Sequence, residues 1–243
     1  YAADTGTGTQ KTISSYWLYT FYGPNDDYGS WNKINQLTDL LPGEGFTMKG
    51  TSGTALISEL QNYVFKGLPN NGDISLALNK GAGDVDRLVG NPYPSAIDAN
   101  EFILDNLSVA DGGNNTNGTI INGALYFWDH FGEENTHVLK GYVGGYATYN
   151  LTGGVPAISN DSRINDDFSE GLKTPGQFIP VNQGFFVSTK IEGFLNGDGN
   201  TITTVNGGNI VFKTSQRIFA REDGTTTLFF KSTSNKNKGA PAK

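Results

Sequence analysis

Short runs of apolar and aromatic residues, each ended by a turn-forming residue, set the pattern of this chain. Several runs alternate apolar and polar positions, as Ile74, Leu76 and Leu78 do, and a two-residue period is typical of a strand with one buried face. Dipeptides such as Asn71-Gly72 stand between the runs and favour hairpin turns, because both residue types tolerate positive φ. The pattern predicts strands at residues 16–22, 46–49, 63–66, 73–78, 87–89, 120–128, 142–149, 184–189, 201–205, 209–213, 217–220 and 225–231.

Helical periodicity is confined to two segments. Residues 51–63 carry apolar side chains at helical spacing. Residues 96–104 follow Ser95, a candidate N-cap, and place Asp98 where the positive end of the helix dipole would favour it. Each segment predicts a very short helix of a turn or two.

These elements predict an all-β fold, a double-sheet β-sandwich or jelly-roll with long Gly/Asn-rich loops and one or two very short helices. Many short strands need this arrangement, because a sheet of that size must bury one face against another. Residues 1–231 are expected to form one β-sandwich module, and two subdomains divided near residues 82–86 are the alternative. The Lys-containing residues 232–243 are expected to be a flexible linker or the end of a fragment.

The amino-acid composition agrees with this fold class and argues against several classes of function. The chain has 243 residues, of which 33 are Gly and 12% are aromatic, and its net charge is −7. An acidic chain without a basic stripe does not neutralise phosphates, so we expect no nucleic-acid partner. No run of apolar residues is long enough to cross a bilayer, so no membrane span is predicted. The absence of Cys excludes disulfides, thiolate metal sites and a cysteine nucleophile.

The sequence LVGNPYPSAID at residues 88–98 is the most distinctive segment. A strand stops there, and Pro92 and Pro94 then force an extended corner, since proline disfavours both helix and ladder pairing. We expect Tyr93 to lie on the edge of the core with its hydroxyl free to hydrogen-bond. Either X–Pro bond is a candidate for the cis isomer, which is typical of tight turns.

As a string, this corner resembles a motif of large exported surface proteins of Bacteroidota. Strands similar to residues 124–129, 180–187 and 212–219 follow the corner in those proteins, so the resemblance spans residues 46–220. Such proteins usually leave the cell by the type IX secretion system, using a separate C-terminal sorting domain. The resemblance implies an extracellular or cell-surface location and a structural or adhesive β module, and we expect the chain to be a piece of a longer protein.

A weak internal echo links residues 42–48 with residues 180–187. Each segment has a Pro-led turn, then polar residues, then a Gly-Phe pair that is expected to start a buried strand.

No catalytic constellation stands out, and we predict a non-enzymatic protein. His130 and His137 are the only histidines, and a solvated loop after a strand explains them better than a metal or acid–base site does. The Gly-x-Ser-x-Gly elbow of Ser hydrolases does not occur, and no carboxylate pair is singled out for glycoside hydrolysis.

A calcium loop is the one metal-site hypothesis. Asn196, Asp198 and Asn200 place oxygen-bearing side chains at every second position, as hard cations require. An ordinary hairpin turn is the alternative. We expect no required cofactor, and Ca²⁺ is the one candidate.

Aromatic residues supply the remaining candidate site. Trp17, Tyr19 and Trp31 lie close together in sequence and could form a flat platform for sugar rings, with core packing as the alternative. Tyr146 and Tyr149 do not share one strand face, because an odd offset separates them.

The leading functional hypothesis is a structural or adhesive cell-surface module that assembles into a fibre, for example as a homo-oligomer joined by strand addition. The alternative is a carbohydrate-binding module of a larger secreted protein or glycoside hydrolase. Other surface-protein subunits or glycans are the expected partners.

Overall fold

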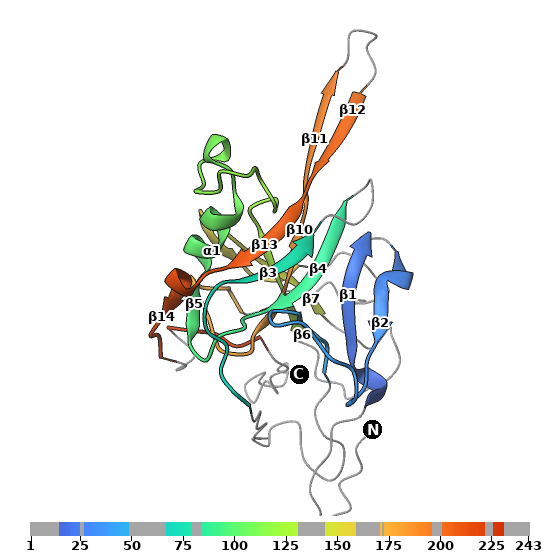
Figure 1. The fold of residues 1–243 in the computed structure, drawn as a ribbon, viewed down its shortest axis with the longest axis vertical. Helices are drawn as coiled ribbons and strands as arrows, with labels where there is room; N and C mark the ends of the chain where they lie inside the picture. The colour runs from blue at the N-terminus through green and yellow to red at the C-terminus, as the bar shows by residue number, and fades with distance from the viewer. Residues whose placement is uncertain are drawn as a thin grey trace, which may run out of the picture.

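A computed structural model describes residues 15–24, 27–48, 67–78, 84–130, 144–158, 171, 173–195, 201–221 and 226–230. Its regular structure is almost entirely antiparallel β, with one short α-helix in the described ranges (Figure 1). The predicted all-β sandwich class is confirmed.

The larger layer is a seven-stranded antiparallel sheet with the order β2-β1-β4-β10-β6-β7-β8. Its members in chain order are β1 (Tyr19–Pro24), β2 (Trp31–Lys33), β4 (Val85–Gly90), β6 (Leu125–His130), β7 (Gly144–Asn150), β8 (Gly153–Val155) and β10 (Gly184–Ser188).

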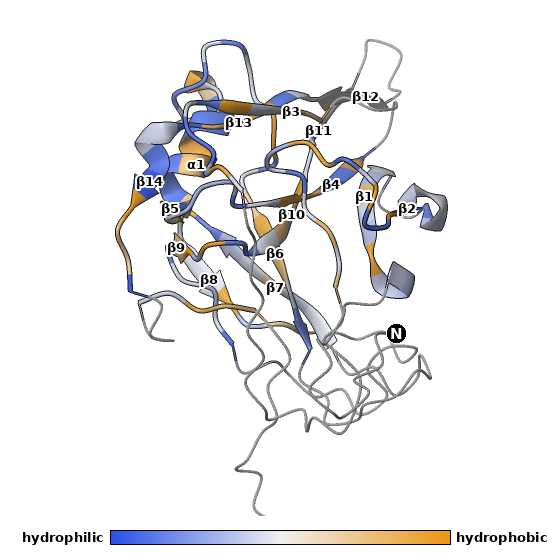
Figure 2. Ribbon diagram, turned by 60° about the horizontal axis from the view of Figure 1, so that its bottom comes forward, coloured by the Kyte–Doolittle hydropathy of each residue, from blue (hydrophilic) through white to orange (hydrophobic). Residues whose placement is uncertain are grey.

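The second layer is made of smaller units that cover one face of this sheet (Figure 2). They are the pair β3 (Ile74–Leu78) and β13 (Gly208–Phe212), the sheet of β5 (Ala96–Asp98), β9 (Phe178–Ile179) and β14 (Arg217–Ile218), and helix α1 (Ala99–Asn106). Short 3-10 turns complete the fold: η1 (Ser15–Trp17), η2 (Tyr28–Ser30), η3 (Val109–Asp111) and η5 (Thr214–Gln216). No helix within the described ranges is both long and apolar enough to cross a bilayer.

A two-stranded ribbon joins the two layers. It consists of β11 (Lys190–Leu195) and β12 (Thr201–Asn206), which continue β10 and lead into β13. The ribbon projects well beyond the sandwich in Figure 1.

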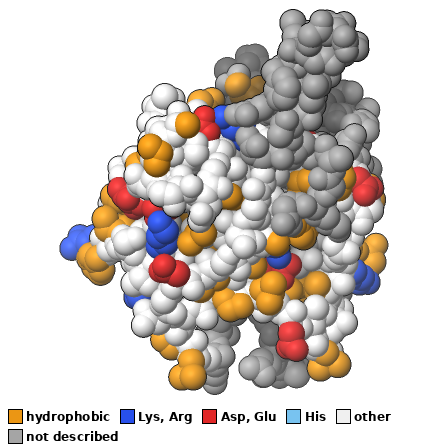
Figure 3. All heavy atoms as spheres, turned by 45° about the horizontal axis from the view of Figure 1, so that its top comes forward, with side chains coloured by type: hydrophobic (Ala, Val, Ile, Leu, Met, Phe, Trp, Pro, Cys, Tyr) orange, Lys and Arg blue, Asp and Glu red, His pale blue; other side chains and the backbone are white. Residues whose placement is uncertain are grey.

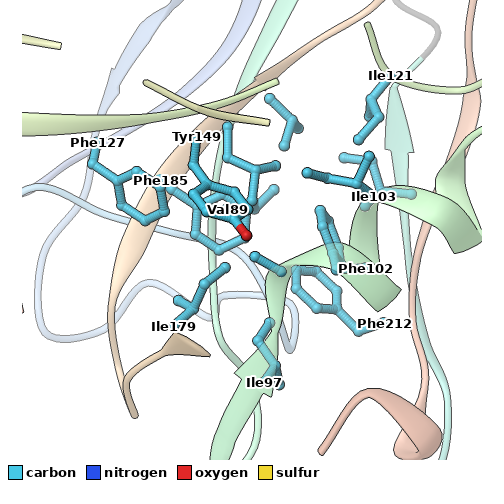
Figure 4. Packing of buried hydrophobic residues seen from close by; sticks show 14 of the residues in the cluster. Val89, Ile97, Phe102, Ile103, Ile121, Phe127, Tyr149, Ile179, Phe185 and Phe212 are labelled. Atoms are coloured by element: carbon cyan, nitrogen blue, oxygen red, sulfur yellow. The ribbon is translucent and has the colours of Figure 1, made fainter. Parts of the chain in front are cut away.

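The core lies between the layers and follows the strand register. Val89 on β4 is paired with Phe185 on β10, and both point inward because side chains alternate along each strand. Phe102 of α1 fills the centre, with its ring centroid 5.6 Å from that of Phe185 and 4.9 Å from that of Phe212 (Figure 4). Each fully buried side chain of this size contributes about 1.5–3 kcal/mol from apolar burial.

Helix α1 begins later than the sequence predicts. Residues 96–98 form β5 because they pair with β9 and β14, and the helix starts at Ala99. Asp98 is its N-cap, with a carboxylate oxygen that accepts from the amide of Asn100 at 2.9 Å, so the expected cap at Ser95 is wrong. The other expected helix, at residues 51–63, lies outside the described residues.

The Gly-Asn-Pro-Tyr-Pro corner is held by its own polar groups. The Asn91 amide nitrogen contacts the carbonyl oxygens of Ser95 at 2.8 Å and Pro180 at 3.1 Å. The Tyr93 ring is buried, and its hydroxyl lies 2.8 Å from the carbonyl oxygen of Gly72 and 3.0 Å from that of Phe212. The expected hydrogen-bonding role of Tyr93 is confirmed, whereas no cis peptide bond occurs among the described residues.

The two segments of the internal echo flank the same strand. Gly184 pairs with Gly90 on one side of β4, and on the other side the amide of Gly45 donates to the carbonyl of Leu88 at 3.1 Å. A Cβ on Gly45 would lie 2.6 Å from the Val89 carbonyl oxygen, so this approach requires glycine. The expected buried strand at residues 46–49 is wrong for its described part, residues 46–48, because Phe46 is 36% exposed and only an isolated bridge between Thr47 and Tyr19 forms there.

Other differences from the predicted strands arise because some strands form by pairing with a neighbour and show no alternation of apolar and polar residues. β8 lies in a segment expected to be a loop, and it exists because Val155 pairs with Thr148 of β7. Strands β2, β9 and β11 were not predicted either, whereas residues 120–124 and 226–230 are not in strands.

Candidate functional site

The face of the large sheet opposite the core carries a row of aromatic side chains from five strands. We call it the outer aromatic row, and its members are Trp31 on β2, Phe21 on β1, Phe186 on β10, Tyr146 on β7 and Trp128 on β6. Phe186 occupies this face because its neighbours in sequence, Phe185 and Val187, point into the core.

Edge-to-face contacts connect the rings of this row. The Phe21 centroid lies 4.9 Å from that of Trp31 and 5.5 Å from that of Phe186. The ring centroid of Phe186 lies 5.6 Å from that of Tyr146, and the Tyr146 centroid lies 5.2 Å from that of Trp128. Interplanar angles between 67° and 85° are those that the aromatic quadrupole favours. The row is therefore a continuous apolar track across the sheet.

Exposure is greatest at the β6–β7 end of the row, whereas Trp31 at the other end is half-buried. Phe21 is 4% exposed, whereas Trp128 is 36% and Tyr146 41% exposed. Val155 on the neighbouring edge strand points to the same face and is 52% exposed. We call Trp128, Tyr146 and Val155 the open end of the row.

A glycine makes room for the indole of Trp128. A Cβ on Gly144 would lie 2.5 Å from Trp128 Cζ2 and 2.9 Å from the carbonyl oxygen of Asp129. The indole therefore packs directly on the backbone of β7, which fixes its orientation.

A polar pair lies on the same face, next to the row. The Ser188 hydroxyl donates to the Asp86 carboxylate across β10 and β4. Burial raises the pKa of Asp86, against the lowering effect of the Ser188 hydrogen bond, and the charge of Asp84 adds to the rise. The pair offers an acceptor that is already oriented.

Tyr146 offers a donor close to the open end. Burial, followed by the negative charge of Asp86, raises the pKa of Tyr146 to about 12. The hydroxyl stays protonated at physiological pH and can donate a hydrogen bond.

The character of the face restricts the ligands that it suits. Among the described strand residues on this face, Asp86 is the acidic group and Lys33 on β2 the basic one, and uncharged side chains separate them. The side of the molecule that Figure 3 shows has the same general character: uncharged side chains and backbone cover most of its described surface, and charges are scattered over it. An apolar track with a few oriented hydrogen-bonding groups fits an uncharged polyhydroxyl molecule better than a phosphate or a strongly charged peptide.

The three aromatic residues singled out from the sequence do not form one platform. Trp31 belongs to the row, and Tyr19 points to the same face of β1. Trp17 lies in η1, edge-on to Tyr16 with centroids 4.9 Å apart. Trp128 was missed as a site residue, although alternation along β6 would have placed it on the outer face.

The other predicted site residues give no further site. Asn196, Asp198 and Asn200 lie outside the described residues, as does His137. His130 ends β6. No group of three or more His, Asp or Glu side chains that could hold a metal ion occurs within the described ranges.

Comparison with known proteins gives one match. The model of a family described as a domain of unknown function (DUF8693) matches residues 4–242. No curated protein matches the chain, and no solved structure matches it. Because the family match covers nearly the whole sequence, the chain belongs to the DUF8693 family.

Proposed function

We propose that this chain is an adhesive module of a bacterial surface protein, displayed outside the cell, that attaches to neutral carbohydrate through the open end of the outer aromatic row. The observation that carries this proposal is the pair of Trp128 and Tyr146, which remain exposed at the end of an otherwise packed aromatic track.

The geometry of the open end suits a sugar ring. A pyranose has one face of C–H groups, which packs on an aromatic surface, and a rim of hydroxyls, which need donors and acceptors. The Trp128 indole is fixed by Gly144, so little side-chain freedom is lost when a ligand packs on it. The Tyr146 hydroxyl and the Asp86 carboxylate supply a donor and an acceptor on the same face.

The cell-surface setting rests on the resemblance of residues 88–98 to exported proteins of Bacteroidota. At the cell surface, a ligand-binding face on a rigid β-sandwich would attach the cell to the carbohydrate that it binds. The proposed role is non-catalytic and needs no cofactor.

Native affinity electrophoresis with soluble neutral polysaccharides, followed by a glycan array, tests this proposal. We expect retardation by at least one neutral glycan and its loss in Trp128→Ala. Phe219→Ala is the matched control, because it removes another exposed aromatic side chain, 92% exposed, from the segment after β14. No retention on any glycan, or equal loss in both variants, would contradict the proposal.

Self-assembly is a second candidate function, and the ribbon of β11 and β12 favours it. These strands pair only with each other among the described strands, and a two-stranded ribbon on its own is marginally stable in water. Pairing with a neighbouring copy would satisfy its edges.

Replacement of residues 191–205 by an Asn-Gly turn tests assembly, because Lys190 and Asn206 are already paired at the base of the ribbon. We expect the wild-type chain to form oligomers at high concentration by light scattering, and the shortened chain to remain a folded monomer. A monomeric wild type would remove this candidate.

A further inference from the structure

The carboxylate of Asp129 and the ammonium of Lys173 form an ion pair at the edge of the core. Asp129 is 1% exposed and Lys173 9% exposed, and Lys173 Nζ lies 3.3 Å from Asp129 Oδ1. Asp129 is the inward-pointing residue near the end of β6, and Lys173 comes from the segment that leads into β9.

Aromatic side chains lie beside the ammonium of this pair. Lys173 Nζ lies 5.7 Å from the centroid of the Phe230 ring, which stacks on Phe127 at 5.2 Å. The backbone amide of Phe230 donates to Gln183 Oε1 at 2.7 Å, which anchors the main chain at this ring. The amine and the carboxyl group are therefore both buried side by side, and the amine faces an aromatic ring.

The Asp129 carboxylate lacks the support that buried carboxylates usually have. Neither oxygen accepts a hydrogen bond, and the contact with Lys173 lacks hydrogen-bond geometry. Asp105, also buried, provides the contrast. Lys213 Nζ donates to one of its oxygens at 2.8 Å and Gln216 Nε2 to the other at 2.9 Å. An ionised carboxylate buried without hydrogen bonds is costly, and one close cation offsets little of that cost.

We propose that Lys173 and Asp129 are joined by an intramolecular isopeptide bond. The ammonium of Lys173 transfers a proton to the carboxylate, which gives a neutral amine and a carboxylic acid. Nζ attacks Cγ of Asp129, the new C–N bond forms, and the carboxyl C–OH bond breaks. One water molecule leaves, made of that hydroxyl and a proton from nitrogen, with no change in oxidation state and no co-reactant.

The bond removes both buried charges and adds a covalent clamp. It links the end of β6 to the segment before β9 and closes a loop over residues 129–173, which contains β7 and β8. The open end of the outer aromatic row lies on β6, β7 and β8, so the covalent bond would hold the strands of the proposed attachment face together when the attached chain is pulled. The inference itself rests on the ion pair and is independent of the ligand.

Intact mass under denaturing conditions tests the bond. We expect the wild-type chain to lie one water, about 18 Da, below its sequence mass, and proteolysis to yield one branched peptide containing both residues. Lys173→Arg keeps the positive charge but cannot form this amide, so its full sequence mass is expected. The measurement does not depend on whether the variant folds well.

Two controls separate the bond from other sources of the same mass change. Asp-Gly steps such as Asp111-Gly112 lose water through succinimide formation, and that deficit would persist in Lys173→Arg. Lys213→Arg alters the hydrogen-bonded ion pair with Asp105 and is expected to retain the deficit. A wild-type chain at its full sequence mass, or a deficit that persists in Lys173→Arg, would overturn the proposal.

Discussion

Phe185 and Phe186 are neighbours on β10, yet they belong to two different environments. Phe185 is 1% exposed and packs on Phe102 of α1. Phe186 is half-buried and packs on Phe21 and Tyr146, on the face that α1 does not cover. Both faces of the sheet are aromatic, so composition does not distinguish them.

The difference between the two faces lies in what covers them. The inner face is closed by α1 and the strands of the second layer, and its rings hold the fold together (Figure 4). The rings of the outer face pack mainly on one another and end in the exposed Trp128 and Tyr146. An aromatic row that remains exposed at one end is poorly explained by stability alone, and this is the reason for assigning it to binding.

The largest expected effect comes from alanine at these two neighbouring positions. Phe185→Ala should lower the free energy of unfolding by about 3–5 kcal/mol, because it leaves a cavity in the core. Phe186→Ala should lower the free energy of unfolding by about half as much, since its site is half-buried, and it should also weaken retention by the glycan. Urea denaturation of both variants measures the difference, and equal losses would mean that the two faces are energetically alike.

The corner at Asn91 should matter for stability and leave binding unchanged. Asn91→Ala removes the amide that contacts the carbonyls of Ser95 and Pro180, so buried acceptors lose their donor. We expect a loss of about 2–3 kcal/mol in urea denaturation. If the variant were stable but failed to bind the glycan, the corner would belong to the ligand site.

Gly144→Ala should have a smaller effect on stability but a clear one on binding. The added methyl group would meet both the Trp128 indole and the Asp129 carbonyl oxygen, so we expect glycan affinity to fall several-fold and the free energy of unfolding to fall by about 1–2 kcal/mol. Gly176→Ala is the control, because a Cβ there meets nothing within 4 Å. Titration of both variants measures the affinities, and equal affinities would contradict a role for the indole orientation.

The smallest predicted effect is a pH dependence at the base of the ribbon. Hydrogen bonds from Lys190, Thr119 and Ser108 lower the pKa of Asp111 to about 2, from an ordinary value of 3.8. The ionised carboxylate therefore stabilises this junction above about pH 4, and that contribution is lost as pH falls through about 2.

Amide hydrogen exchange at the ribbon base should accelerate across this range after correction for intrinsic rates. Asp111→Asn should remove the pH dependence. A wild-type profile that stays flat would show that Asp111 does not hold the junction.

The sequence predicts the fold better than the site for physical reasons. Alternation identifies β3, β10 and β13, because each has one buried face. It misses β8, whose Gly153 and Gly154 have no side-chain pattern and which depends on pairing with β7. The corner at residues 90–94 was recognisable from proline chemistry alone.

The candidate site was only partly predictable. Trp31 was identified from a cluster of aromatic residues in sequence. The row itself is assembled by strand order, which brings the ring centroids of Trp31 and Phe186 to 6.0 Å from each other. Sequence proximity instead favoured Trp17, which lies in η1. The contact between Asp129 and Lys173 depends on tertiary structure and left no sequence signal.

The fluorescence of Trp128 as the sole tryptophan tests the central claim most directly. The chain has 3 Trp, so Trp17→Phe combined with Trp31→Phe isolates it. Titration with the polysaccharide that retards the wild-type chain should give a saturable change in emission, with the half-point found by affinity electrophoresis. Emission that stays constant while the chain still binds would place the ligand elsewhere and contradict the assignment of this face.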